Sequence, residues 1–237
     1  MFQSGVASHS GPAMNDDGEL GLFGRTLLAA DDPRPLHSVP DLLRPQVLDA
    51  LLLKVYGPHL LAGHLPVLVS QWSKYYFMAL IPPVVAAALI EDWHWPLGLD
   101  QVNLALDERG LPDGVRFGPG ARAMLGASEC FASLLDDNLE PFIATLAAYS
   151  GVAASVLWGN AGDYLETCLT QLRLLTDRPL DAGDALLTHP YRPDGRRNPL
   201  FKAVGYVGDP LRRQRRRCCL SYQVAWVGRC EHCPLKG

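Results

Sequence analysis

Four of the six cysteines of this chain lie within its last twenty residues. They are Cys218, Cys219, Cys230 and Cys233, and their spacing is C-C-x10-C-x2-C. A Cys-x-x-Cys step allows two thiolates from one tight turn to bind the same metal ion. Adjacent cysteines in a regular strand point to opposite faces. Binding through all four therefore requires a bent backbone at the Cys-Cys pair.

Three kinds of chemistry are compatible with these thiols. A [2Fe–2S] cluster takes four thiolates, usually from cysteine. Structural zinc also takes four cysteines, usually from two Cys-x-x-Cys-like knuckles; only Cys230 and Cys233 have that form here, with His232 between them as a spare ligand. Two disulfides are disfavoured, because the N-terminus has no secretory signal and a reducing compartment is expected. The spacing alone does not separate [2Fe–2S] from [4Fe–4S].

The other two cysteines occur in apolar, helix-like surroundings. Cys130 lies in SECFASLL and Cys168 in LETCLTQL. Free cysteine in such a context behaves as a small buried hydrophobe. We therefore expect Cys130→Ser and Cys168→Ser to leave any cluster unchanged.

Charge is distributed unevenly along the chain. The 237 residues carry a net charge of −4, with 48% hydrophobic and 19% charged residues. From Leu200 onward, eight Lys/Arg stand against two acidic residues, so a basic tail of +6 follows a body of −10. The overall balance does not indicate a nucleic-acid partner.

A run of arginines in this tail has three interpretations. It could be a solvated strand face or a dock for an acidic electron-transfer partner, a source of positive charge that stabilises thiolates and raises a reduction potential, or a nucleic-acid patch. The run comprises Arg212, Arg213, Arg215, Arg216 and Arg217.

No nucleotide or hydrolase motif accompanies the cysteines. The sequence contains no GxGxxG, no GxxxxGK[ST] and no HExxH. No flavin or nicotinamide site is visible, so redox chemistry here would draw its electrons from another protein.

The pattern of apolar residues predicts a single α+β domain that is predominantly α-helical. We expect a loosely ordered segment at 1–40 with one helical turn near 22–28, a mainly helical body at 41–211 and a basic, cysteine-rich cluster segment at 212–237. The body contains a hairpin signal at 101–120, and short antiparallel strands precede a C-terminal cluster-binding loop. Expected helices span 45–57, 65–93, 121–151 and 152–175.

Two of these helices carry potential breaks. Pro82 and Pro83 should kink or split the helix at 65–93, and Gly159-Asn160 could interrupt the helix at 152–175. The longest apolar stretch, residues 75–90, is shorter than the roughly 20 residues that cross a membrane. We interpret it as buried core and expect no transmembrane segment.

Several further motifs, in order along residues 65 to 237, make the sequence similar to the FhuF-like ferric-siderophore reductases. The C-C-x10-C-x2-C spacing is the most specific of them. SQWSKYYFMALIPPVVAAAL (70–89) resembles the family's Trp and Tyr segment running into an apolar helix, although only two residues separate Trp72 from Tyr75. LWGNAGDYL (157–165) resembles its W-x-N motif, RRNPLF (196–201) its N-P-L-[FW] step, and RRRCC (215–219) its basic strand.

The resemblance implies a [2Fe–2S] cluster bound by Cys218, Cys219, Cys230 and Cys233. It implies one-electron reduction of Fe(III) in a siderophore, often of hydroxamate type, with release of Fe(II) in the cytoplasm for iron assimilation. A ferredoxin or a ferredoxin/flavin reductase would supply electrons, and peripheral association with the inner membrane is compatible with this role. Two alternatives of other classes are a zinc-stapled nucleic-acid or protein binding module and an iron–sulfur sensor or carrier.

Candidate substrate contacts follow from closeness to the cluster in sequence. They are Arg215, Arg217 and Trp226. The residues that carry the resemblance are expected to build the helical core or a pocket wall. These are Trp72, Tyr75, Tyr76, Trp158 and Asn160.

Overall fold

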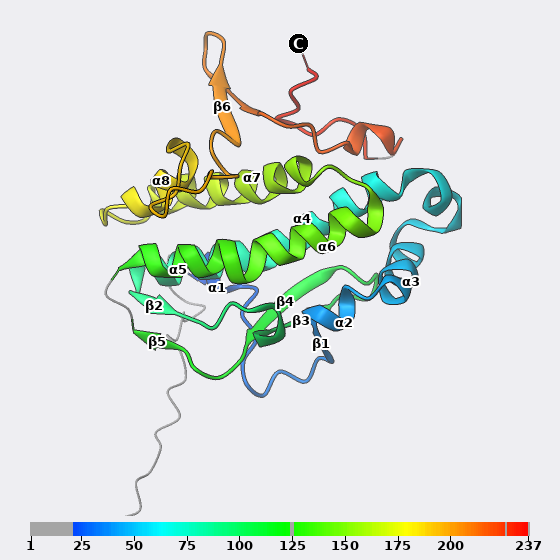
Figure 1. Ribbon diagram of the computed structural model, residues 1–237, viewed down its shortest axis with the longest axis horizontal. Helices are drawn as coiled ribbons and strands as arrows, with labels where there is room; N and C mark the ends of the chain where they lie inside the picture. Colours follow the sequence, from blue (N-terminus) through cyan, green and yellow to red (C-terminus); the bar gives the residue numbers. More distant parts are fainter. Residues whose placement is uncertain (1–20, 124–125, 226, 237) are drawn as a thin grey trace, which may run out of the picture.

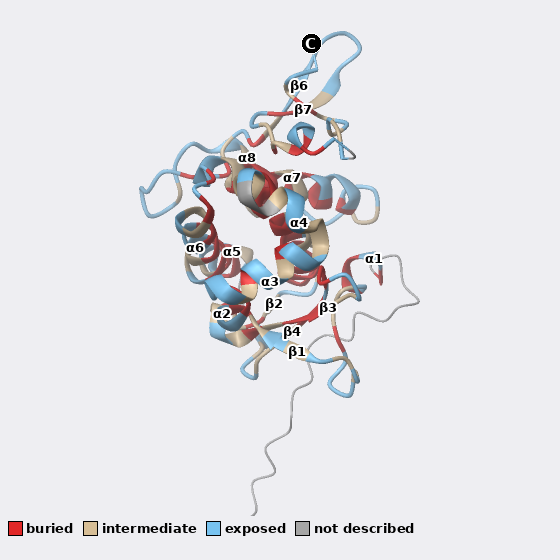
Figure 2. Cartoon of the chain, turned by 90° about the vertical axis from the view of Figure 1, so that its right-hand side faces the viewer, coloured by how far each residue is buried: buried red, intermediate tan, exposed pale blue. Residues whose placement is uncertain are grey.

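The computed structural model describes residues 21–123, 126–225 and 227–236, apart from the side chains of residues 61 and 62. A layer of helices lies between a small β-sheet on one side and the C-terminal segment on the other (Figure 1). Buried residues concentrate where the helices face one another and the sheet (Figure 2). The predicted α+β fold, predominantly helical with a few short antiparallel strands, is confirmed.

Helices account for about half of the described residues. The first of the long helices, α3, begins with Pro45 in its first turn and ends before Gly57, whose φ is 80°, as the Pro and Gly signals predict. The α-helices are α1 (Gly21–Gly24), α2 (Val39–Leu42), α3 (Pro45–Tyr56), α4 (Pro58–Ile90), α5 (Ala127–Ser133), α6 (Glu140–Ser150), α7 (Ala154–Leu172) and α8 (Asp181–Thr188). The shorter turns are η1 (Leu99–Gln101), the π-helical η2 (Leu134–Leu139) and η3 (Ser221–Gln223).

Helix α4 is continuous over 33 residues, although Pro66, Pro82 and Pro83 lie inside it. Of the two predicted effects of the proline pair, a kink or a split, the split is wrong. Pro83 has no N–H to donate to the carbonyl of Ala79, four residues earlier. The hydroxyl of Thr26 donates to that carbonyl instead, at 2.7 Å. A side chain from another element thus replaces the missing backbone hydrogen bond.

The apolar residues of α4 form the centre of the protein. By length and composition the part Gly63–Ile90 could cross a membrane, but 72% of its most apolar window is buried inside the protein. Helices α3, α6 and α7 and strand β4 pack around it. The prediction that residues 75–90 are buried core is confirmed, since Leu80, Val84 and Val85 have no exposed surface.

The main sheet has the order β1-β3-β4 and is antiparallel throughout. Strands β3 (Val102–Leu106) and β4 (Pro112–Phe117) form the predicted hairpin, and β1 (Leu36–Ser38) adds an unpredicted edge strand. Two small pairs complete the strands: β2 (Trp93–His94) with β5 (Arg122–Ala123), and β6 (Val204–Val207) with β7 (Arg212–Arg215). The division of the chain into segments at 40 and 211 stays a prediction.

Aromatic stacking joins α4 to α6, and a hydrogen bond joins α4 to η2. The rings of Tyr76 and Phe142 stack with centroids 3.8 Å apart, and Trp72 stacks on Phe142 at 6.4 Å. The Tyr76 hydroxyl donates to Oδ1 of buried Asn138 at 2.8 Å. Trp72 and Tyr76, which carry part of the family resemblance, are therefore core residues.

Candidate iron–sulfur site and adjacent arginine-lined hollow

The cysteine segment begins where the β6–β7 hairpin ends. Strand β7 stops at Arg215, and the chain bends before the Cys-Cys pair. The basic strand expected from RRRCC (215–219) therefore does not include the cysteines. Leu220 has a φ of 65°, in the left-handed region. This bend satisfies the requirement that both adjacent cysteines reach one site.

The two halves of the segment bring one thiol of each half close together. The Sγ atoms of Cys219 and Cys230 lie 3.7 Å apart. Two thiolates that bind one tetrahedral metal ion at about 2.3 Å are about 3.8 Å apart, whereas disulfide sulfurs are about 2.05 Å apart. Burial, followed by the neighbouring Cys219 and Cys233, raises the pKa of the Cys218 thiol.

The donor set fits an iron–sulfur cluster, with some side-chain adjustment. No three ligand side chains of the described residues are already assembled around a metal position. The hydrogen bond from the Cys230 thiol, followed by the Lys74 ammonium, lowers the pKa of Cys219, and the same contact raises the pKa of Cys230. Burial raises the pKa of Cys130 to about 12. Cys130 and Cys168 are buried in the helical body, as predicted.

Hydrogen bonds and burial shape the surroundings of the sulfurs. Cys219 and Cys233 are buried, whereas Cys218 and Cys230 are partly exposed. The Leu220 N–H donates to Cys218 Sγ at 3.4 Å, and Ser221 Oγ lies 3.4 Å from Cys219 Sγ. Donors to sulfur and solvent exposure are among the features that set a cluster's reduction potential.

Helix α4 holds the Cys-Cys pair through one carbonyl. The backbone oxygen of Cys219 accepts hydrogen bonds from Ser70 Oγ at 2.9 Å and from Gln71 Nε2 at 2.7 Å. Both side chains are buried. Because an unpaired buried carbonyl is costly, these two donors fix the position of the segment on the helix.

Asn160 of α7 links α4 to the C-terminal segment. Its Nδ2 donates to the Ser70 carbonyl at 2.9 Å, and its Oδ1 accepts from the Arg215 guanidinium. Arg215 also lies 3.5 Å from Asp163 Oδ2. The side chain of Arg215 is 2% exposed, so it positions the segment and is withdrawn from a substrate at the surface.

Two glycines allow α7 to approach this segment closely. A Cβ at Gly162 would overlap the Cβ of Ala203, and one at Gly159 would lie 3.0 Å from the Cβ of Arg217. The predicted break at Gly159-Asn160 is wrong, because both residues continue the helix. A second ion pair joins the same surfaces, with Arg213 Nε 2.6 Å from Glu166 Oε2.

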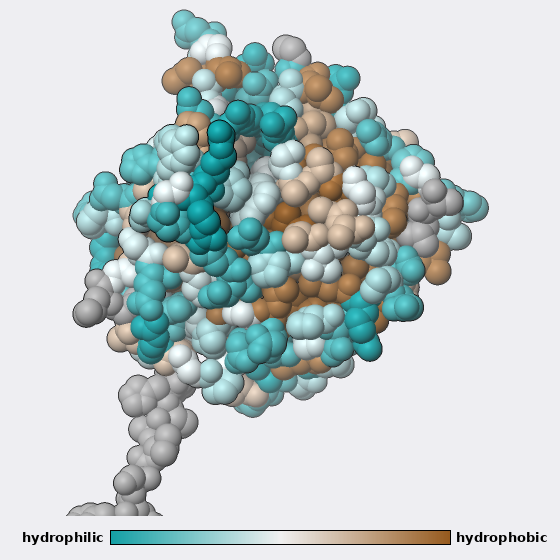
Figure 3. All heavy atoms as spheres, in the orientation of Figure 1, coloured by the Kyte–Doolittle hydropathy of each residue, from teal (hydrophilic) through white to brown (hydrophobic). Residues whose placement is uncertain are grey.

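A hollow of about 400 Å³ opens beside the cluster segment. Three exposed arginines and three aromatic side chains line it, and no carboxylate does. In the space-filling view, strongly hydrophilic side chains gather over the loop between α8 and β6, beside an apolar area of the same face (Figure 3). The arginines are Arg197, Arg216 and Arg217, and the aromatic residues are Trp158, Tyr191 and Phe201.

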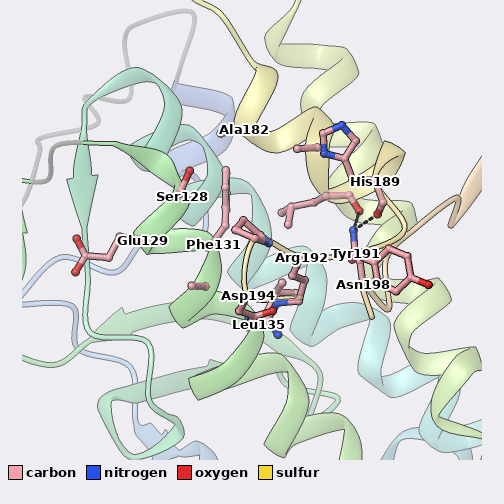
Figure 4. Close-up of a pocket in the computed structure, with 14 residues that line it drawn as sticks. Ser128, Glu129, Phe131, Leu135, Ala182, His189, Tyr191, Arg192, Asp194 and Asn198 are labelled. Atoms are coloured by element: carbon pink, nitrogen blue, oxygen red, sulfur yellow. Dashed lines mark hydrogen bonds and ion pairs between the residues drawn. The ribbon is translucent and has the colours of Figure 1, made fainter. Parts of the chain in front are cut away.

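The loop between α8 and β6 separates this hollow from a second one of about 460 Å³. Asn198 holds the loop in place, since its Nδ2 donates to the carbonyls of Leu186 and His189, each at 2.8 Å (Figure 4). The second hollow has mostly apolar walls and includes Glu129 and Asp194. It therefore differs in charge from the arginine-lined hollow.

The predicted substrate residues separate in the structure. Arg217 is exposed and lines the arginine-lined hollow, Arg215 is buried, and Trp226 lies outside the described residues. Sequence reasoning missed Ser70, Gln71 and Arg197 as parts of this region. Ser70 and Gln71 stand at the start of the SQW segment and Arg197 inside RRNPLF, so the motifs marked them without revealing their partners.

A helical body that carries four cysteines in one C-terminal segment, beside an arginine-lined hollow, has the thiol set of a small iron–sulfur protein. Residues 70–212 match the family described as "Ferric iron reductase FhuF-like transporter". Residues 215–235, which include all four C-terminal cysteines, match the "FhuF 2Fe-2S C-terminal domain". The chain belongs to the FhuF family. It is an oxidoreductase with a [2Fe–2S] cluster, and its family acts in the reduction of siderophore iron.

Similarity to individual proteins agrees with this assignment. The "Ferric siderophore reductase" of Escherichia coli strain K12 is 24% identical over 227 residues, which covers 87% of this chain and 82% of that protein. Among solved structures, aerobactin synthetase IucA from a hypervirulent pathotype of Klebsiella pneumoniae superposes with a TM-score of 0.53 at 14% identity. That match covers 72% of this chain and 38% of the synthetase; the ATP-bound form gives 0.52 and 13%. These two structures share the fold of the matched region.

Proposed function

We propose that this chain passes one electron at a time to Fe(III) held in a siderophore of hydroxamate type, through a [2Fe–2S] cluster bound by Cys218, Cys219, Cys230 and Cys233. The match of residues 215–235 to the FhuF 2Fe-2S C-terminal domain, together with the close approach of the Cys219 and Cys230 thiols, supports the proposal. The pair separation of 3.7 Å between Cys219 and Cys230 is the spacing that a shared metal ion requires. Cys218 and Cys230 are partly exposed, so one side of the cysteine site is near solvent.

The chemistry of the iron explains why one electron suffices. Hydroxamates offer hard, anionic oxygen donors, which hold the small, highly charged Fe(III) firmly and Fe(II) poorly. When bound, the cluster supplies one-electron transfer at a potential set by its protein surroundings. For each turnover one electron enters from the donor, Fe(III) becomes Fe(II), and the chelator leaves with its bonds unchanged.

The chain's own residues have positioning and protective roles in this scheme. Ser70, Gln71 and Asn160 fix the cysteine segment on α4 and α7. Burial of Cys219 and Cys233 keeps water from part of the thiol group. Transfer between centres requires no general base or nucleophile, which is consistent with the absence of a catalytic triad motif from the sequence.

The proposal also names the electron donor and the cellular compartment of the reaction. The electron donor is a ferredoxin or a ferredoxin/flavin reductase, because the sequence carries no nucleotide-binding motif of its own. Reduction takes place in the cytoplasm and releases Fe(II) there for assimilation. Peripheral contact with the inner membrane would bring the protein close to incoming siderophore.

A single-turnover experiment tests the proposal. Holoprotein is reduced anaerobically with dithionite, freed of excess reductant and mixed with a ferric tris-hydroxamate in the presence of a colorimetric Fe(II) chelator. We expect the oxidised visible spectrum to return with one Fe(II) captured per cluster. A cluster that stays reduced while no Fe(II) forms, with ferric complexes of any charge, would leave the sensor or carrier role instead.

A further inference from the structure

The arginine-lined hollow contains positive charge that the protein itself does not neutralise. Within the described part of the chain, Arg197, Arg216 and Arg217 make no ion pair with a carboxylate. Nearby arginines behave differently. Arg192, Arg196, Arg213 and Arg215 each lie within 4.0 Å of an Asp or Glu oxygen.

Unpaired guanidinium groups around a concave surface are suited to an anionic ligand. Arginine presents a planar fork of donors that matches carboxylate and similar oxygen pairs. The hollow of about 400 Å³ lies in the range of small-molecule sites. Trp158, Tyr191 and Phe201 add flat apolar surface for the organic part of a ligand. No Asp or Glu lines the hollow, so nothing in its wall opposes negative charge.

The hollow is also next to the cysteine site. Arg217 precedes Cys218 in sequence and packs over Gly159 of α7. The backbone N–H of Arg216 donates to the Ala203 carbonyl at 2.8 Å, and its guanidinium donates to the Phe201 carbonyl at 3.3 Å. A ligand held by these arginines would therefore lie beside the residue that begins the cysteine cluster.

We propose that this hollow docks the ferric siderophore and selects complexes with net negative charge over neutral tris-hydroxamate complexes. Such complexes arise where a carboxylate supplements hydroxamate groups or where catecholates replace them. The inference rests on the proposed function and sharpens it, since it names the charge of the preferred substrate and the side chains that read it.

Gallium(III) complexes separate docking from electron transfer, because Ga(III) matches Fe(III) in charge and size but is not reduced. Calorimetric titration of the holoprotein would use three probes: a neutral Ga(III) tris-hydroxamate, an anionic Ga(III) complex of a mixed carboxylate–dihydroxamate, and an anionic Ga(III) tris-catecholate. We expect both anionic probes to bind more tightly than the neutral one. The ratio between the two anionic probes then identifies which oxygen chemistry the hollow prefers.

Arginine variants locate the binding. Arg197→Gln, Arg216→Gln and Arg217→Gln should each weaken binding of the anionic probes about tenfold, the effect of one charged hydrogen bond, and change binding of the neutral probe less than about twofold. Arg212→Gln is the matched control, because Arg212 is an exposed arginine of β7 outside the hollow. The visible spectrum of each variant verifies that its cluster is intact.

The outcomes distinguish the two proposals. Docking in this hollow would be overturned by any of three results. Arg212→Gln could weaken binding of the anionic probes as much as the three hollow variants do, the three hollow variants could still bind all probes tightly, or the unchanged protein could bind the neutral probe more tightly than the anionic ones. If the three variants reduce anionic ferric complexes at the unchanged rate, docking in this hollow is also overturned. The reductase function would then stand without this docking site. Arginine-dependent binding of Ga(III) probes by a protein that reduces no ferric complex would support the docking site and overturn the proposed function.

Discussion

The helical body and the C-terminal cysteine segment are held in place by different interactions. The body buries large apolar and aromatic side chains, among them Tyr76 and Phe142, in a continuous core around α4. The segment from Arg216 onward buries few side chains, with Cys219, Val224 and Cys233 the main ones. It relies on hydrogen bonds from Ser70 and Gln71 and on its thiols.

This difference indicates how each region responds to loss of the cluster. A core built by apolar burial is stable without a metal group, because its free energy comes from removing surface from water. A short segment with few buried side chains gains its order from ligand bonds, since metal binding and local folding share one free energy. Substitutions in the two regions should therefore have separable effects on cluster retention and on unfolding of the body.

The largest expected effect is at the four C-terminal cysteines. Changing Cys218, Cys219, Cys230 or Cys233 to Ser should abolish or markedly alter the visible absorption between roughly 400 and 600 nm, because a [2Fe–2S] cluster takes four thiolates. Anaerobic absorption and electron paramagnetic resonance spectra measure this.

The buried cysteines of the body are the matched controls for this prediction. Cys130→Ser and Cys168→Ser should retain the spectrum, even if the polar hydroxyl lowers the unfolding midpoint. Loss of the cluster in Cys130→Ser would show that the proposed ligand set is incorrect.

The next largest effect is expected where α7 approaches the segment. Gly162→Ala places a Cβ against that of Ala203 and should lower the free energy of unfolding by about 1–3 kcal/mol. It should also speed transfer of iron to an external chelator, because β6 must move away. Gly63→Ala is the control, since a Cβ at this helical glycine meets nothing within 4 Å. A similar loss of unfolding free energy in Gly63→Ala would show that the effect at Gly162 does not come from close packing against Ala203.

Substitution of two buried asparagines, one in each region, compares the regions directly. Asn160 joins α7 to Ser70 and Arg215, whereas Asn138 joins η2 to Tyr76 and Leu97 inside the body. Each change to Ala should cost about 1–3 kcal/mol, because buried partners lose their hydrogen bonds.

Cluster retention distinguishes these two variants. Asn160→Ala should release iron to a chelator faster at temperatures where the body is folded, while Asn138→Ala should lower the unfolding midpoint and leave that rate unchanged. Equal release rates from the two variants would contradict separate stabilisation of the segment.

The smallest effect concerns an ion pair that holds the loop between the two hollows. Asp136 Oδ1 and Oδ2 each lie 2.6 Å from a guanidinium nitrogen of Arg192. Arg192 and Arg196 lower the pKa of Asp136 from 3.8 to about 2. Because the folded-state pKa is the lower one, this stabilisation is complete above pH 4 and disappears as the pH falls towards 2.

Asp136→Asn should therefore cost no more than about 1 kcal/mol near neutral pH, since the pair is partly exposed. Urea unfolding followed by circular dichroism at pH 7, 4 and 2.5 should show the difference from wild type narrowing at the lowest pH. A difference that grows on acidification would contradict the assigned direction of the pKa shift.

Short-range sequence patterns predicted much of the architecture. Helix α3 between Pro45 and Gly57, the β3–β4 hairpin and the burial of residues 75–90 follow from capping signals and periodicity, which act over a few residues. The bend at the Cys-Cys pair follows from the directions of adjacent side chains. The number and spacing of the thiols limited their chemistry to an iron–sulfur cluster, a zinc site or disulfides, and the ordered motifs identified the family.

Only the tertiary structure decided what depends on contacts between distant residues. Pro82 and Pro83 lie inside one helix, and Thr26, far away in sequence, donates to the Ala79 carbonyl that Pro83 leaves without a backbone donor. Gly159, the site of the predicted break, lies inside α7 and faces Arg217.

The arginines provide the clearest case. In sequence, Arg213, Arg215, Arg216 and Arg217 form one run, but folding buries Arg215, pairs Arg213 with Glu166 and leaves the last two beside Arg197 at a hollow. Residue type and spacing determine which chemistry is available, since ligation and helix formation are local. Which charges are neutralised and which face a ligand depends on partners that folding brings from other elements, and these partners have no signature in the local sequence.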